Sequence, residues 1–267
     1  MIYRLDNFTE SALNPVTGQA WDGSWIIFML TDGDYTMFCG SVNGCAYTLK
    51  VSRKYAHWPM ALGDFIGYNS AVGKNIILVL PEEEYRRALD AYGVHTHDEP
   101  FLRAYESPVL IHSTTPEGWA GIQRDSCLKS WNQLHRQPSH EAAPIGTLLG
   151  DPAELRDFIL FGSGVTGEIV VSSRQKGRIE MDVNAEYTPG ARLYFDMARI
   201  ARDGLLVRDG SEMKVRDALP LAPYLLWAAT PAALGMASTS TPHAFAQAAD
   251  AQFQRRVKPD DQSAHQH

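Results

Sequence analysis

The sequence predicts a mixed α+β fold with two folded units and a low-complexity tail. Its 267 residues are 45% hydrophobic and 21% charged, which is a globular composition. Short apolar runs rich in β-branched and aromatic residues alternate with segments that carry helix-start signals. A polar stretch at about 93–100 separates an N-terminal unit, residues 1–100, from a second unit at 101–230. The tail covers residues 231–267.

Four strands and one helix are expected in the N-terminal unit. The strands are apolar runs bounded by turn residues, at 25–30, 35–38, 46–51 and 74–80. The helix has Pro81 at its first position, carboxylates in its first turn and Gly93 at its end. Tyr85, Leu89 and Tyr92 form its apolar stripe. These elements describe a small α+β accessory domain.

The second unit opens with a strand at 107–112 and a helix in which Thr114 and Glu117 have capping-box spacing. The residues after it are expected to form a polar loop over 129–150, a helix from 151, and strands at 168–172, 178–183 and 191–195. A short helix over 196–203 is expected to end at Gly204, before two short strands and the segment 223–227. From about Pro231 the chain lacks periodicity, so we expect a disordered or loosely docked tail.

Charge and hydropathy narrow the classes of partner. The formal net charge is −7, and no stretch is basic enough for tight, non-specific binding to a phosphate backbone. No run approaches about eighteen apolar residues, so we expect no membrane partner. The first residues lack a basic and an apolar region, and the three cysteines show no zinc spacing. We therefore expect a cytoplasmic protein with reduced thiols.

Three local patterns have ordinary explanations that we favour. Gly162-Ser163-Gly164-Val165-Thr166-Gly167 matches G-x-G-x-x-G, but a strand pattern follows it where a dinucleotide-binding loop needs a helix. A flexible glycine loop beside a site is therefore expected there. The His95 to Asp98 stretch is expected to be an exposed linker and not a metal site, and no metal ligands are predicted. Cys127 is expected to be a small buried side chain.

His112 is the strongest candidate for a functional residue. It stands at the end of an apolar strand, directly before a small-residue turn and a capped helix. Anionic ligands are commonly held where a strand end meets a helix N-terminus. We therefore expect a ligand site at His112, with a structural histidine as the alternative.

The residues around His112 resemble a known family. Ile111 to Thr114, followed by a helix with Trp119 and Ile122, is similar to the His-Gly-Thr strand and helix that open the ADP-ribosyltransferase fold. The closest resemblance in motif order is to the NAD-dependent RNA 2′-phosphotransferases. The implied fold is a split β-sheet domain of the ADP-ribosyltransferase type.

The downstream stretches follow the same order. Residues 193–205 resemble the family's strand, acidic residue, short helix and Asp-Gly turn. Residues 210–215 resemble its Asn-Gly-Val-Trp-Leu strand, and residues 219–225 resemble its closing Pro-Pro-x-Tyr-Leu segment. The resemblance is colinear over about 108–227.

The resemblance implies NAD as the cofactor. His112 would hold the nicotinamide ribose, Tyr187 would stack on the nicotinamide, and Arg174 would pair with the diphosphate. The remaining cofactor-binding residues implied are Ser113, Thr114 and Gly164. Bond breakage through an oxocarbenium-like state needs a carboxylate, for which Glu186 and Glu168 are the candidates.

The sequence departs from the phosphotransferases at defined positions. Ser113 replaces a glycine, and Glu168 to Ser172 lies where the family has a second histidine. The family's Arg-His-Gly segment falls near Glu186 to Thr188, or less well near Arg174. We therefore expect an NAD-dependent enzyme of the glycosyltransferase class that transfers ADP-ribose to a macromolecular acceptor, protein or nucleic acid. The alternatives are a catalytically degenerate nucleotide- or partner-binding module, or an RNA 2′-phosphotransferase.

Overall fold

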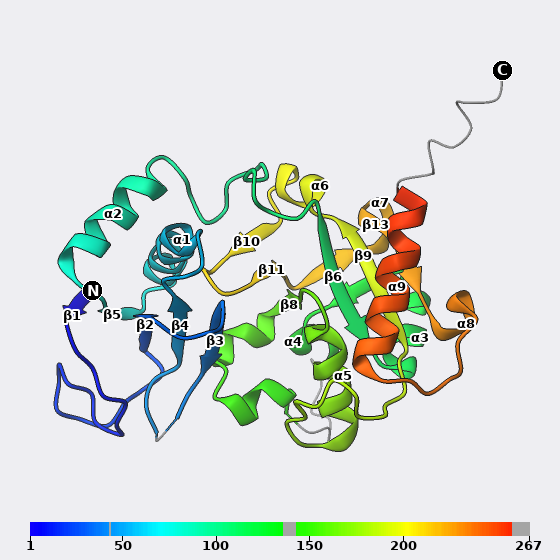
Figure 1. Ribbon diagram of the computed structural model, residues 1–267, viewed down its shortest axis with the longest axis horizontal. Coiled ribbons are helices and arrows are strands. Elements are labelled where there is room, and N and C mark those ends of the chain that lie inside the picture. Colours follow the sequence, from blue (N-terminus) through cyan, green and yellow to red (C-terminus); the bar gives the residue numbers. More distant parts are fainter. Residues whose placement is uncertain (43, 136–142, 258–267) are drawn as a thin grey trace.

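The computed structural model describes residues 1–42, 44–135 and 143–257, and it shows a mixed α+β protein built from several small sheets (Figure 1). The predicted α+β class is confirmed. In Figure 1 the N-terminal sheet lies toward one end of the molecule and the C-terminal helix α9 toward the other.

The N-terminal part is a five-stranded sheet in the order β1-β5-β2-β4-β3. Its strands are β1 (Ile2–Leu5), β2 (Trp25–Thr31), β3 (Met37–Gly40), β4 (Thr48–Ser52) and β5 (Asn75–Val79). The pairs β1–β5, β5–β2 and β2–β4 are parallel, and β3 pairs antiparallel with β4. The four predicted strands are present, and β1 is an additional one.

Helices α1 (Trp58–Ala71) and α2 (Glu82–Tyr92) contribute to the core on one face of this sheet. Helix α1 provides the long crossover that the parallel strands β4 and β5 require. It was not predicted, because ten of its fourteen residues are buried and it therefore lacks an amphipathic pattern. Helix α2 confirms the predicted helix, with Pro81 at the N-cap position instead of the first turn.

The second part contains two three-stranded sheets and a two-stranded ribbon, all antiparallel. One sheet has the order β13-β9-β6, from β6 (Val109–Thr114), β9 (Ala191–Asp196) and β13 (Leu225–Ala229). The other has the order β10-β11-β8, from β8 (Phe158–Phe161), β10 (Leu206–Arg208) and β11 (Met213–Arg216). The ribbon pairs β7 (Cys127–Lys129) with β12 (Ala218–Pro220).

The two three-stranded sheets meet at one point, where the backbone N–H of Gly162 donates to the carbonyl of Ile111 at 3.0 Å. Apolar side chains from both sheets form a shared core that includes Leu110, Ile159, Leu193 and Phe195. Each such side chain contributes about 1.5–3 kcal/mol when fully buried. This core fixes β6 against β8.

Short helices connect these strands. Thr115, and not the expected Thr114, caps α3 (Pro116–Asp125), because its Oγ1 accepts the N–H of Gly118 at 3.1 Å. Helix α6 (Met197–Arg202) begins after its cap Asp196, close to the predicted position. The remaining short elements here are α4 (Trp131–Leu134), α7 (Leu221–Tyr224) and the 3₁₀ helices η1 (Ile145–Leu149) and η2 (Ala153–Asp157).

Helices α4 and η1 lie in the stretch 129–150, which was expected to be one loop. Residues 136–142 of that stretch lie outside the described residues. The helix expected from 151 is limited to η2, because Phe158 already begins β8.

The strand predicted at 168–172 is wrong, because these residues belong to helix α5 (Thr166–Lys176). The β-branched residues there favoured a strand, but Glu168 and Ser172, four residues apart, share the buried face of the helix. No strand forms at 178–183 either. Glu180 is tied back to α5, since its N–H donates to Ser173 Oγ at 2.9 Å and its carboxylate pairs with Lys176 at 2.8 Å.

The tail is not disordered over its described part, so this expectation is wrong for residues 231–257. It forms α8 (Pro231–Leu234) and α9 (Pro242–Val257). Phe245 and Phe253 of α9 are buried, and Phe253 stacks on Tyr194 of β9 with ring centroids 4.2 Å apart. Alanines fill the positions between these anchors, so the apolar pattern was too weak to detect. Residues 258–267 lie outside the described part.

Candidate functional site

His112 lies on β6 where the two three-stranded sheets meet. Its Nδ1 is 3.1 Å from the carbonyl oxygen of Leu160 on β8, and its ring meets Phe161 edge-on. Because a carbonyl oxygen only accepts hydrogen bonds, Nδ1 carries the ring hydrogen and Nε2 keeps its lone pair. Burial lowers the pKa of His112, and the hydrogen bond to Leu160 opposes that shift only in part. His112 is therefore a neutral side chain with Nε2 available as an acceptor.

Ser113 points to the opposite face of β6, as alternation along a strand requires. Its hydroxyl donates to Oε1 of Glu168 at 2.6 Å, and Oε2 of Glu168 pairs with Nη1 of Arg192 at 2.6 Å. The side chains of Arg192 and Glu168 are 0% and 1% exposed. Burial raises the pKa of Glu168, while Arg192 and the Ser113 hydroxyl oppose this shift. Both oxygens of Glu168 therefore have partners inside the protein.

Arg192 is the centre of a buried network that joins three parts of the chain. Its Nη2 donates to the carbonyl of Gly164 at 2.8 Å, and its Nε donates to Asp250 of α9 at 2.9 Å. The Tyr194 hydroxyl donates to the same Asp250 oxygen at 2.6 Å. A buried guanidinium is tolerated only when its donors are satisfied in this way. The network fixes the glycine loop and α9 against β9.

Tyr187 lies in the interior beside this network. It is 4% exposed, and its ring packs with Val171 and Phe245. Its hydroxyl has no hydrogen-bond partner among the described residues, and burial raises its pKa. Its backbone pairs with Ser240, so α9 and the segment before it cover this side chain.

Glu186 and Arg174 are exposed side chains. The guanidinium of Arg174 lies over the ring of Trp131, 5.5 Å from its centroid. The segment that follows Glu186 runs beside the end of β6, because Gly190 donates to the carbonyl of Thr114 at 3.0 Å. A β-carbon at Gly190 would lie only 2.1 Å from the carbonyl carbon of Thr115, so only glycine permits this approach.

The structure therefore divides the predicted site residues into groups. Ser113, Gly164 and Glu168 meet around Arg192, with Tyr187 beside them. His112 lies on the other face of β6, and the hydroxyl of Thr114 lies against Gly118 of α3. Glu186 and Arg174 are at the surface.

Sequence reasoning missed Arg192 and Asp250. A lone arginine in the apolar run Ala191 to Phe195 was a usable signal, because a charge inside a buried strand needs a partner. Asp250 is 58 residues away from Arg192 in the chain and carried no such signal.

The glycine motif does lie between a strand and a helix, β8 and α5, contrary to the expectation that a strand follows it. However, β8 pairs antiparallel with β11, whereas a dinucleotide-binding loop belongs to a parallel βαβ unit. The carbonyl of Gly164 is held by Arg192. The loop is therefore a connection beside the network and not a Rossmann fingerprint.

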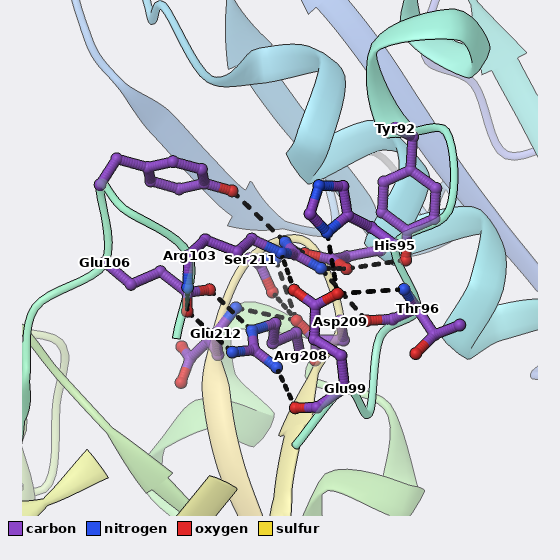
Figure 2. Close-up of polar contacts among 12 residues, drawn as sticks. Tyr92, His95, Thr96, Glu99, Arg103, Glu106, Arg208, Asp209, Ser211 and Glu212 are labelled. Carbon is purple, nitrogen blue, oxygen red and sulfur yellow. Dashed lines mark hydrogen bonds and ion pairs between the residues drawn. The ribbon is translucent and has the colours of Figure 1, made fainter. Parts of the chain in front are cut away.

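A second polar cluster connects the two halves of the molecule (Figure 2). Arg103 forms a bidentate pair with Asp64 of α1 at 2.6 and 2.7 Å, and its Nε donates to Glu99 at 2.5 Å. Arg208 of β10 forms a bidentate pair with Glu106 at 2.7 Å to each oxygen. We call these five residues the junction. Bidentate geometry in a buried place gives strong and specific contacts.

The stretch expected to be an exposed linker contributes directly to this junction. His95 Nδ1 is 2.8 Å from Glu99, and the carbonyl of His97 accepts the N–H of Arg208 at 2.9 Å. Within the described ranges, no group of three or more histidine, cysteine, aspartate or glutamate side chains could hold a metal ion. In the same part of the chain, no helix has the length and apolar character needed to cross a bilayer.

Comparison of the chain with protein-family models, with curated proteins and with solved structures found no match.

Proposed function

We propose that the chain is an NAD-dependent ADP-ribosyltransferase whose nicotinamide ribose binds at His112. The observation that carries this proposal is the position of His112 at the meeting point of two three-stranded antiparallel sheets, with its tautomer fixed by Leu160. A neutral Nε2 acceptor suits a ribose hydroxyl donor. The division of the strands between two small sheets supports the resemblance to the ADP-ribosyltransferase fold. The colinear order of the motifs over residues 108–227 supports it as well.

The residues available for NAD can be separated from those already engaged. Arg174 has no carboxylate partner among the described residues, so its guanidinium can pair with a diphosphate. Glu168 is held by Arg192 and Ser113, so its role is to position β6 and α5. Glu186 is exposed, and its segment borders the end of β6, so it is our candidate for the carboxylate that receives the acceptor's proton.

NAD would supply a reactive glycosidic bond, because nicotinamide is a good leaving group. His112 would fix the sugar by accepting from a hydroxyl, and the interior location of His112 would limit access of water to that sugar. The bond that breaks joins the anomeric carbon to nicotinamide, and the bond that forms joins that carbon to the acceptor. Glu186 takes the proton that the acceptor loses. The acceptor is a macromolecule, protein or nucleic acid.

A second candidate function is a binding module that holds a nucleotide or a partner without chemistry. It is favoured by the surroundings of His112. The pKa of His112 is shifted by burial and by the Leu160 carbonyl, and no carboxylate contributes to this shift. Of the two candidate carboxylates, Glu168 is already paired with Arg192.

Isothermal titration with NAD, followed by an assay for released nicotinamide, distinguishes these candidates. We expect saturable binding and nicotinamide release by the full chain, with both lost in His112→Ala. His243→Ala makes the same change at an exposed position on α9 and should leave both unchanged. Binding without release would support the module, and absence of NAD binding would exclude the transferase proposal. Thermal unfolding of His112→Ala, compared with the full chain, checks that the variant is folded.

A further inference from the structure

A cavity of about 80 Å³ lies beside the junction. One wall comes from the N-terminal part, with Met37, Tyr55 and Asp64. The other comes from the turn between β10 and β11, with Ser211 and Glu212. Tyr105, which is 36% exposed, also lines the cavity, so the cavity has access from outside.

The arginines beside this cavity have little capacity left for a ligand. All five N–H donors of Arg103 have acceptors, since Tyr105 and the carbonyl of Thr96 complete the set begun by Asp64 and Glu99. Arg208 makes four hydrogen bonds, two to Glu106 and two to backbone carbonyls. An anionic ligand would therefore find no unpaired cation here.

Glu212 is in the opposite situation. In the described part of the chain its carboxylate has no hydrogen-bond or ion-pair partner, and Figure 2 shows it at the edge of the cluster. Among the described residues, the cation that acts on it is Lys214, which is already paired with Asp209. Asp209 and Asp151 add negative charge around it. When Glu212 is ionised, its carboxylate therefore has no cation of its own among the described residues.

The shape of the turn is fixed, so the cavity does not depend on a mobile loop. Gly210 has a φ of +88°, and a β-carbon there would lie 2.3 Å from the carbonyl oxygen of Ala61. Asp209 Oδ1 accepts from the N–H groups of Ser211 and Glu212 at 2.9 and 2.8 Å. Glu212 is thereby held at the cavity wall between α1 and β11.

We propose that this cavity binds a small organic cation, an ammonium or guanidinium group, which pairs with Glu212. The rings of Tyr55 and Tyr105 and the thioethers of Met37 and Met213 complete a soft, polarisable wall that suits such a cation. A metal ion would need more ligands than the described residues bring together. This site uses none of the side chains assigned to NAD around His112.

Binding at this site is linked to protons. Burial, with Asp209 and Asp151, raises the pKa of Glu212 to about 8, so the side chain is protonated at neutral pH. A cation that pairs with the carboxylate releases this proton, and its affinity should therefore rise as the pH approaches about 8. Cys39 and Tyr47 of the N-terminal sheet also face Glu212, and both stay protonated because burial raises their pKa values.

The other charged groups around the cavity wall are engaged with one another. Asp64 pairs with Arg103, and Glu106 pairs with Arg208. The hydroxyls of Tyr55 and Tyr105 stay protonated, since burial raises their pKa values also. Glu212 is therefore the group whose titration the ligand should sense, with a smaller contribution from Asp151, whose pKa burial raises to about 6.

Isothermal titration of the full chain with methylguanidinium chloride tests the site, with sodium chloride at equal ionic strength as the reference. We expect saturable binding near pH 8, affinity at least about tenfold weaker near pH 6, and proton release near pH 7. Glu212→Gln should weaken binding near pH 8 about tenfold or more and leave only the smaller pH dependence that Asp151 contributes. Glu83→Gln, the same change on the exposed side of α2, should bind like the unchanged protein.

Three results would overturn the proposal: no binding by the unchanged protein near pH 8, equal binding by Glu212→Gln, or binding of acetate in place of the cation. Circular dichroism of Glu212→Gln confirms that the variant is folded. Because NAD takes no part in this titration, its outcome does not depend on the activity at His112.

Discussion

Arg192 shows what one buried charge requires of its surroundings. Its guanidinium is enclosed by Glu168, Asp250 and the carbonyl of Gly164, which come from α5, α9 and the glycine loop. Replacing a buried ion pair by apolar groups can be neutral, whereas removing one partner leaves a charge without compensation. Replacing a single member of the network should therefore cost more stability than the loss of one contact between two residues would cost.

Arg192→Met is expected to lower the free energy of unfolding by about 3–5 kcal/mol, because Glu168 then stays buried without its cation. Adding Glu168→Gln should restore part of this loss, since the neutral amide costs less to bury. Urea unfolding of the two single variants and the double variant measures the coupling. Strict additivity of the two changes would contradict the pairing seen in the structure.

Glu212 predicts how stability depends on pH. Its pKa is raised to about 8 in the folded protein, so between its ordinary value and pH 8 the folded state holds a proton that the unfolded state has lost. Stability therefore falls as the pH rises through this window. Glutamine imitates the protonated form, so Glu212→Gln should exceed the unchanged protein by about 1 kcal/mol or more near pH 8 and match it near pH 4.

Denaturant titrations at several pH values measure this difference. Glu83→Gln serves as the control, because it replaces an exposed carboxylate. A difference between Glu212→Gln and the unchanged protein that stays constant with pH would show that the carboxyl is not protonated in the folded state.

Glu186 and Glu168 are expected to behave differently in the proposed reaction. Glu186→Gln should lower nicotinamide release about a hundredfold, the scale of a positioned acid or base, while leaving stability unchanged because the side chain is exposed. Glu168→Gln should act mainly on stability, since it removes the negative partner of Arg192. Initial rates at saturating NAD, with thermal midpoints of both variants, separate these effects. Full activity of Glu186→Gln would remove this residue from the mechanism.

Helix α9 is an integral element of the fold. It buries Phe245 and Phe253, and it supplies Asp250 to Arg192. Each buried phenylalanine contributes about 1.5–3 kcal/mol, which is a large part of the stability of a typical domain. The composition of residues 242–257 therefore gave no sign that this helix packs against β9 and Tyr187.

Truncation after Pro231 is expected to abolish cooperative unfolding or to lower the thermal midpoint by more than about ten degrees. Truncation after Val257 removes none of these contacts and is the matched control. Differential scanning calorimetry of both proteins checks the prediction. A truncated chain as stable as the control would show that α9 adds nothing to the core.

The elements that could be predicted from the sequence are those with a local signal. The runs that became β2 and β5 have apolar cores, the run that became β9 is apolar apart from Arg192 as far as Phe195, and Asp196 has the chemistry of a helix cap. Helix α1 gave no period because it is buried nearly all round, and α5 was misassigned because its partners Ser113 and Arg192 lie far away in the chain. Long-range pairing decided these elements and could not be derived from local sequence.

The same limit applies to the candidate site. His112 could be identified from its place at a strand end, but the fact that Leu160 fixes its tautomer depends on the contact between two sheets. Arg208 and Glu106 pair across 102 residues of sequence, so the polar stretch beside the junction was interpreted as a linker. A charge pattern shows that a residue needs a partner and does not show which one.

At the scale of the whole molecule, the junction makes the two halves one mechanical unit. Arg103 holds α1, and Arg208 holds the connecting segment to β10. We expect a single calorimetric transition for the unchanged protein. In Arg103→Met, Asp64 is left buried without its cation, so the N-terminal half should unfold at a lower temperature than the rest. A single unshifted transition in this variant would show that the two halves are coupled without the junction.

The position of Asp250 also has a consequence for the order in which the chain is synthesised. The five-stranded sheet is complete once residue 79 has emerged, so it can form while the remainder is being translated. Arg192, in contrast, emerges 58 residues before Asp250, its partner on α9. During that interval Glu168 can already pair with Arg192, but the second carboxylate is still missing. The network of the second half can therefore be completed only when the last helix has been synthesised.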